Sequence, residues 1–457
     1  MEELSRRAKR FTIVSTILGT SIVFVDSTVV NVALPSIQAD LGGGLAAQQW
    51  IVDAYLLTLG SLILVGGSLG DIYGPTRTFT IGVASFGVAS ALCAAAPTST
   101  ALILCRGLQG VAGALLTPAS LAILTAAFSG AERGAAIGTW TAWTGISFVT
   151  GPLLAGWLIG AWTWRAIFLI NIPVAALTLV LTMREVPRVP PGRRGVRVDY
   201  PGATLCAAGL GLVVLGFIEQ PRRGWGDPLI LLAIVLGAAL LAGFVAYEAR
   251  APQPMLPLRL FSKRNFSVTN LETFAVYGGL SAWGFLLSLF LQQLAGWTPL
   301  QAGLATVPVT IVMFLLSRLA GRFSMRYGPR WFMAAGPVLA GLAVLALSRI
   351  PTDPDYAVDL LPALLGFAVG LSLTVAPLTT TVLSEAGPAD AGIASGVNNA
   401  VARVAGLMAI AVIGVLAAGG GNHLTAPGYR DAMILTAVLL LAGGAIGAAG
   451  IRNPRRS

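Results

Sequence analysis

Apolar runs dominate this chain, and each is long enough to cross a lipid bilayer as a helix. A membrane-spanning helix needs about 20 mostly apolar residues, and about fourteen such runs alternate with short charged loops. With 56% hydrophobic and 11% charged residues, the 457-residue chain has too little polar surface to cover soluble domains. The sequence therefore predicts an all-α polytopic membrane protein. The runs lie near residues 11–33, 49–70, 78–97, 100–127, 135–160, 166–183, 202–218, 229–247, 267–291, 301–321, 331–348, 357–383, 396–417 and 432–450.

Lysine and arginine residues concentrate in alternate loops, which predicts the orientation in the membrane because cytoplasmic loops carry the excess of these residues. The basic set comprises the N-terminus, Arg77, Arg133 and the segments 184–197, 250–264, 322–330 and 452–456. Both termini are therefore expected in the cytoplasm, with the protein in the plasma membrane. The net charge of +10 arises from these loops rather than from an aromatic-interleaved patch, so no nucleic-acid partner is expected.

A glycine-framed, charged stretch, Gly67-Ser-Leu-Gly-Asp71-Ile-Tyr-Gly74-Pro75-Thr-Arg77, separates the second and third runs. It is expected to form a cytoplasmic turn, because each charge would cost several kcal/mol in hydrocarbon. The stretch 321–330 repeats its Gly, Tyr-Gly-Pro and Arg pattern 254 residues later, which predicts a duplicated bundle. The predicted domains are an N-terminal six-helix bundle (1–185), cytoplasmic linkers plus two inserted helices (186–264) and a C-terminal six-helix bundle (265–457).

Several motifs resemble those of the major facilitator superfamily and its fourteen-spanner drug:proton antiporters. The stretch 67–77 is similar to the superfamily loop motif, although Ile72, Pro75 and Thr76 replace its usual basic residues. The segment 25–35 resembles the first-helix signature, and Gly151-Pro152-Leu-Leu-Ala155-Gly156 is similar to the antiporter motif. The resemblance covers nearly the whole chain and implies the major facilitator fold, with two six-helix bundles and two inserted helices.

Three charged residues of the first bundle are predicted to lie at similar depth. At 1.5 Å per residue, Asp26 lies about 22 Å from the cytoplasmic end of its helix, with Asp53 and Arg106 about 7 and 9 Å below the opposite surface. Desolvation disfavours an ionised carboxylate and a nearby guanidinium favours it, and a proton carrier requires this balance. We expect Asp26 to be the main proton or cation site, Arg106 its charge partner and Asp53 a second acid. A purely structural ion pair is the competing interpretation.

Glu272 is the corresponding acid of the second bundle. It is expected to pair with Arg403, to contact a cationic substrate, or to extend to the inner membrane surface. Residues 106, 109, 110 and 113 fall on one face of a helix, which is polar and small. The residues predicted to line a substrate cavity are Asn31, Tyr55, Gln109, Gly113, Tyr277 and Arg403. The predicted conformational latch comprises Gly67, Asp71, Gly74 and Arg77. The resemblance implies that Gly151, Pro152 and Gly156 bend a helix and seal the closed side against proton leak.

The predicted function is proton-coupled export of small amphipathic or cationic compounds, such as antibiotics and antiseptics, by alternating access. No Walker A sequence is present, so the proton-motive force rather than ATP is the expected driver. No cofactor or metal is expected, and the protein is expected to act as a monomer among membrane lipids. A dedicated exporter of one endogenous secondary metabolite or lipid is the alternative. An enzyme is not expected, because no nucleophile with a base stands out.

Overall fold

Long helices make up the described part of the chain, as the apolar runs predict. The computed structural model describes residues 5–190, 198–386, 391–417 and 423–453. Within them, thirteen helices are long and apolar enough to cross a membrane. A further helix, α5, spans 32 residues, and its described apolar stretch is Thr150–Ala161. The all-α polytopic fold is confirmed, whereas the count of fourteen spanning helices stays a prediction.

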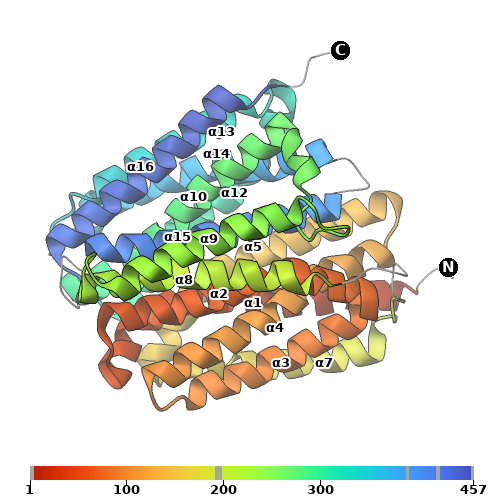
Figure 1. Cartoon of the computed structure of the whole chain (residues 1–457), viewed down its shortest axis with the longest axis horizontal. Coiled ribbons are helices and arrows are strands. Elements are labelled where there is room, and N and C mark those ends of the chain that lie inside the picture. Colours follow the sequence, from red (N-terminus) through yellow and green to blue (C-terminus); the bar gives the residue numbers. More distant parts are fainter. Residues whose placement is uncertain (1–4, 191–197, 387–390, 418–422, 454–457) are drawn as a thin grey trace. The chain divides into compact units, whose positions relative to one another are not determined.

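Contacts between helices divide the chain into two compact units (Figure 1). Unit 1 comprises the described residues of Met1–Gly43, Trp50–Leu210 and Leu240–Met255. Its central helix is α1, which packs against α4, α5 and α7, while α3 packs against α4 and α7. Apart from parts of the two inserted helices, this unit contains α1 (Arg6–Leu41), α2 (Gly44–Tyr73), α3 (Pro75–Ala95), α4 (Ser99–Ala127), α5 (Gly130–Ala161), α6 (Ala166–Leu169) and α7 (Asn171–Glu185).

Unit 2 comprises Gly44–Gln49, Gly211–Ala239 and the described residues of Leu256–Ser457. Its helix α10 packs against α14, α15 and α16, and α13 packs against α14 and α16. The α-helices of this unit are α10 (Arg264–Leu289), α11 (Pro299–Ala305), α12 (Val307–Tyr327), α13 (Arg330–Leu347), α14 (Leu361–Ala386), α15 (Ala391–Ala417) and α16 (Ala426–Gly450). The 3-10 helix η1 (Leu258–Ser262) precedes α10, and the π-helical turns η2 (Phe290–Leu294) and η3 (Tyr356–Leu360) flank longer helices.

The two inserted helices, α8 (Tyr200–Arg223) and α9 (Pro228–Glu248), pack against each other. A Cβ added at Gly216 of α8 would lie 2.5 Å from Ile234 Cγ1 of α9. Each of these helices is divided between the units, at residues 210/211 and 239/240. The predicted three-part boundaries at 185/186 and 264/265 stay a prediction.

The predicted turn at residues 67–77 is much shorter than expected. Helix α2 continues through Tyr73 and α3 begins at Pro75, so Gly74 alone connects them. The helix persists because nothing before Gly74 breaks its hydrogen bonds, and a proline at the first helical position loses no bond. Gly74 has φ 91° and Gly328 has φ 90°, a conformation that favours glycine. The sequence repeat thus corresponds to a repeated glycine conformation, because Gly328 ends α12 with a similar φ, and with Pro329 it connects α12 to α13.

Helices α2 and α4 of unit 1 approach closely where glycines replace larger side chains. A Cβ added at Gly110 would lie 2.1 Å from Thr58 Oγ1 and 2.4 Å from the Tyr55 carbonyl oxygen. Small residues commonly allow such backbone contact between membrane helices. The contact sets the spacing between the helix that carries Tyr55 and the helix that carries Arg106.

We expect Gly110→Ala to destabilise the protein, because the added methyl group meets the backbone of α2 and would force the helices apart. Overpacking of this kind costs about 1–3 kcal/mol. Gly107→Ala is the matched control on the same helix, since its nearest neighbour would be Thr58 Cγ2 at 3.9 Å. Thermal unfolding in detergent checks the prediction. Equal midpoints for the two variants would contradict it.

Candidate functional site

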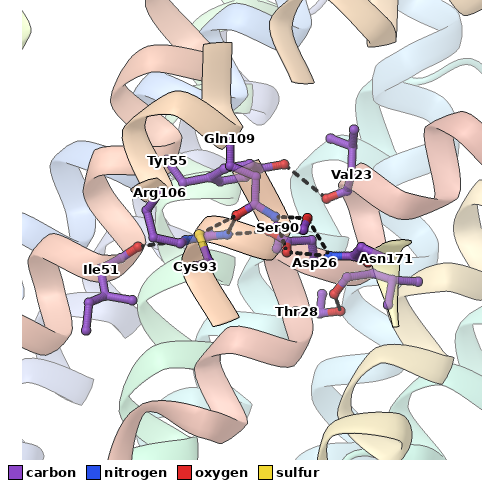
Figure 2. Close-up of polar contacts among 12 residues, drawn as sticks. Val23, Asp26, Thr28, Ile51, Tyr55, Ser90, Cys93, Arg106, Gln109 and Asn171 are labelled. Atoms are coloured by element: carbon purple, nitrogen blue, oxygen red, sulfur yellow. Dashed lines mark hydrogen bonds and ion pairs between the residues drawn. The ribbon is translucent and has the colours of Figure 1, made fainter. Parts of the chain in front are cut away.

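A buried ion pair between Asp26 on α1 and Arg106 on α4 forms the centre of the candidate site (Figure 2). Arg106 Nη1 donates to Asp26 Oδ2, and the side chains are 1% and 0% exposed, respectively. Helix rise placed both residues at similar depth, and the packing of α1 against α4 brings them together. Burial of two charges is expensive unless further hydrogen bonds compensate them, so the neighbouring side chains decide whether this pair is tolerated.

Neutral polar side chains complete the shell around the Asp26 carboxylate. Gln109 Nε2 and Asn171 Nδ2 donate to Asp26 Oδ1 at 2.8 and 3.1 Å. The same two amides lie 2.9 and 3.3 Å from Ser90 Oγ, which accepts from both. Side chains from α4 and α7 therefore converge on one carboxylate of α1, and Ser90 of α3 holds both amides (Figure 2). This is the donor set that a charged carboxylate needs when water is excluded.

The Arg106 guanidinium has partners on α2 as well. Its Nε donates to the Ile51 carbonyl oxygen at 3.0 Å, and its Nη1 donates to Gln109 Oε1 at 2.6 Å. The guanidinium carbon lies 4.3 Å from the centre of the Tyr55 ring, within the range of a cation–π interaction. Tyr55 is fixed in turn, because its hydroxyl donates to the Val23 carbonyl oxygen at 3.1 Å. The pair is thus held by α1, α2 and α4 together.

Asn171, Ser90 and Cys93 belong to this network but were not predicted from the sequence as site residues. Cys93 Sγ lies 3.7 Å from Gln109 Oε1, and all three side chains are buried. The one available signal was a polar residue within an apolar run. Depth along a helix does not reveal which way such a residue faces.

Asp53, the predicted second acid, stands apart from the Asp26 network. Its side chain is fully buried on α2, and neither carboxylate oxygen has a hydrogen-bond partner within the described ranges. Of the predicted cavity residues of unit 1, Gln109 lies at the centre. Gly113 is buried against Leu59, and Asn31 is half-buried farther along α1.

Glu272 and Arg403 are not brought together. Glu272 is fully buried on α10, and among the residues that the structure covers its two carboxylate oxygens accept no hydrogen bond. Its Oε2 faces Gly447 of α16, whereas Arg403 is half-buried on α15. Pairing with Arg403 is therefore not observed, and complete burial contradicts an extension to the membrane surface. Tyr277 is half-buried on α10.

The predicted latch lies at the end of α2. Asp71 and Arg77 are both exposed, Gly67 is half-buried and Gly74 is buried. Thr76 stands where the loop motif usually has a basic residue. It connects the start of α3 to the linker that follows α7. Its hydroxyl donates to the Pro187 carbonyl oxygen and accepts from the Val189 amide, both at 3.0 Å.

The predicted antiporter motif lies where α5 meets α1. A Cβ added at Gly151 would lie 1.9 Å from Thr28 Oγ1, so only glycine fits this contact. Thr28 follows Asp26 by two residues. Pro152 is half-buried, Gly156 is buried, and α5 is one helix through both.

We expect Asp26→Asn to lower the free energy of unfolding by about 3–5 kcal/mol, because Arg106 would remain buried without a counter-charge. Asp40→Asn is the control, since it removes the partly exposed Arg165–Asp40 pair, worth about 1 kcal/mol or less. The double variant Asp26→Asn/Arg106→Gln should recover part of the loss. Unfolding in detergent checks this prediction. Equal losses of stability in Asp26→Asn and Asp40→Asn would contradict it.

Comparisons with known proteins agree with this architecture. The family model described as Major Facilitator Superfamily matches residues 16–411 and 273–456. The puromycin resistance protein pur8 of Streptomyces alboniger is 35% identical over 419 residues, covering 89% of this chain and 82% of that protein. The multidrug resistance protein Stp of Mycobacterium tuberculosis is 35% identical over 421 residues, covering 90% and 76%. An auto-inhibited POT family peptide transporter superimposes with a TM-score of 0.72 at 15% identity, covering 99% of both chains. This chain belongs to the major facilitator superfamily.

Proposed function

We propose that this protein is a proton-coupled exporter of small amphipathic or cationic compounds, antibiotics and antiseptics among them. The observation that carries the proposal is the fully buried Asp26–Arg106 pair with its shell of amide donors. Ionisable residues inside a membrane bundle are costly and mark pathways for ions, protons or substrates. Relatives named for puromycin resistance and multidrug resistance support export of drugs.

Protonation of Asp26 would change the charge of the whole centre. A neutral carboxyl no longer compensates Arg106, and it can accept fewer of the three donors that now converge on it. Because these donors come from α4 and α7, loss of the charge would loosen contacts of both helices with α1. A cationic substrate could compete with the proton for the same carboxylate. This competition is the physical requirement for exchange of one for the other.

The energy available from proton movement is sufficient for export. One proton that moves down 100 mV yields about 2.3 kcal/mol, which sustains a gradient of roughly 40-fold for an uncharged substrate. One-for-one exchange for a monovalent cation moves no net charge, so the pH gradient drives that exchange. Asp53 and Glu272 offer two further buried acids that could carry protons during the cycle.

Orientation and conformational control belong to the same proposal. Both termini are cytoplasmic, and the transporter is a monomer in the plasma membrane. Asp71 and Arg77, exposed beside Gly74, form a latch that is released between conformations. The tight contact of Gly151 with Thr28 supports a role for α5 in sealing the region next to Asp26.

A dedicated exporter of one endogenous metabolite or lipid is the second candidate. It is favoured by the relative that is named for resistance to a single compound, puromycin. Such a transporter would show a narrow substrate range and little protection against unrelated drugs.

We expect purified protein in weakly buffered detergent to release protons when a lipophilic cation dye is added. Release should disappear in Asp26→Asn, measured below the unfolding midpoint of that variant, because the proton is displaced from the fraction of the protein in which Asp26 is protonated and an amide cannot hold it. Asp53→Asn and Glu272→Gln are parallel variants. If Asp26→Asn releases as many protons as the wild type, the coupling site lies elsewhere. If the wild type releases none with any of a broad set of cations, export of multiple cationic drugs is contradicted.

A further inference from the structure

Glu272 occupies an unusual position in unit 2. Its side chain is 0% exposed and lies on α10, which packs against α14, α15 and α16. Both carboxylate oxygens lack a hydrogen-bond partner within the described segments, and so does the buried hydroxyl of Thr269, three residues earlier on the same helix. An ionised carboxylate in these surroundings would be desolvated without compensation, at a cost of many kcal/mol.

A backbone carbonyl of α13 beside Glu272 has lost its helical hydrogen-bond donor. In a regular helix the Met333 carbonyl would accept from the amide four residues later, but that residue is Pro337, which has no N–H. The Met333 carbonyl oxygen therefore lacks its usual helical donor. It belongs to the small group of backbone acceptors that a buried donor can satisfy.

Gly447 of α16 brings the carboxyl and this carbonyl to the same place. A Cβ added at Gly447 would lie 2.6 Å from the Met333 carbonyl oxygen and 2.9 Å from Glu272 Oε2. The missing side chain lets both oxygens pack against Gly447, and this contact between α10, α13 and α16 is called the notch below. The two distances sum to 5.5 Å, so the oxygens lie no farther apart than that. A carboxyl group without a hydrogen-bond partner among the described residues and a carbonyl without its helical donor are therefore close neighbours.

We propose that this notch is a proton-binding site of unit 2, in which Glu272 is a neutral carboxylic acid that donates its proton to the Met333 carbonyl oxygen. Proton uptake forms one O–H bond on the carboxylate and breaks none in the protein. A proton fits better than a metal cation, because a hard cation such as Ca²⁺ takes six or more oxygen ligands. The oxygen atoms that lie nearest to Gly447 are the Met333 carbonyl and one Glu272 carboxylate oxygen, far fewer than six.

The charged groups on the neighbouring helices do not pair with Glu272. Arg264 of α10 and Arg330 of α13 donate instead to the last carbonyls of α16, at Ala448, Ala449 and Gly450. On α14, Glu385 accepts from Asn265 at 2.9 Å, and the charged group of α15 is Arg403. The described part of α16 has Arg430 and Asp431 near its opposite end. No cationic side chain among the described residues therefore pairs with Glu272, which leaves neutralisation to a bound proton.

The Glu272 site deepens the proposed function. It rests on that function only for the claim that proton movement drives export. Separation of α13 or α16 from α10 would remove the acceptor and admit water, and either change favours proton release. Proton occupancy of the Glu272 site can be tested without measuring transport. A failure of the proposed site is therefore distinguishable from a failure of the proposed export function.

Infrared spectroscopy of the reconstituted full-length protein at neutral pH tests the site. We expect a C=O stretching band of a protonated carboxyl that shifts in D₂O and is absent from Glu272→Gln. Pro337→Ala should move this band, because the alanine supplies an N–H that competes for the Met333 carbonyl. Pro377→Ala, which replaces a proline within α14, is the matched control and should leave the band in place.

Three results would overturn the inference. Identical C=O stretching bands of protonated carboxyl groups in wild type and Glu272→Gln would show that Glu272 is ionised. A band that appears only when sodium is replaced by choline would show that sodium, rather than a proton, occupies the notch. A band that Pro337→Ala leaves unmoved would exclude the Met333 carbonyl as the acceptor. Loss of the band in Glu272→Gln together with its shift in Pro337→Ala supports the site even if no dye releases protons from the protein.

Discussion

The charge of Arg106 constrains the interior of unit 1 more than any other single group. A guanidinium keeps its charge in a protein, so its burial at 1% exposure demands a counter-charge and fixed acceptors. Asp26, Ile51 and Gln109 supply them, and the Tyr55 ring covers one face. Each of these groups is placed by a helix contact, and Gly110 allows α4 to approach α2 closely. Packing and electrostatics in unit 1 therefore depend on each other.

Two kinds of buried carboxyl group coexist in this protein. Asp26 is surrounded by donors, which suits a charged group, whereas Glu272 borders an acceptor, which suits a neutral one. The repeated Gly74 and Gly328 connections show that the two halves share a backbone plan. Their chemistry has nevertheless diverged. Different proton affinities in the two units would allow one site to hold its proton while the other exchanges it.

Much of the fold could be predicted because apolar runs of about 20 residues have one stable solution in lipid. The depth of Asp26 and Arg106 followed from the helix rise alone. The rotation of each helix about its own axis did not follow from the helix rise, and this rotation decides which side chains meet. It turns Asn171 and Ser90 toward Asp26, and it turns Glu272 toward Gly447 rather than toward Arg403. The pattern at 67–77 predicts too long a turn, because glycines and charges often mark helix ends, whereas only Gly74 of this stretch has a positive φ.

Exchange of protons for substrate is the central claim, and proteoliposomes test it most directly. Vesicles would be loaded with a cationic substrate and a pH-sensitive dye, then diluted into substrate-free buffer with the membrane potential clamped. The account predicts that substrate efflux acidifies the lumen through wild-type protein. Protein-dependent efflux without any change in luminal pH would contradict proton coupling.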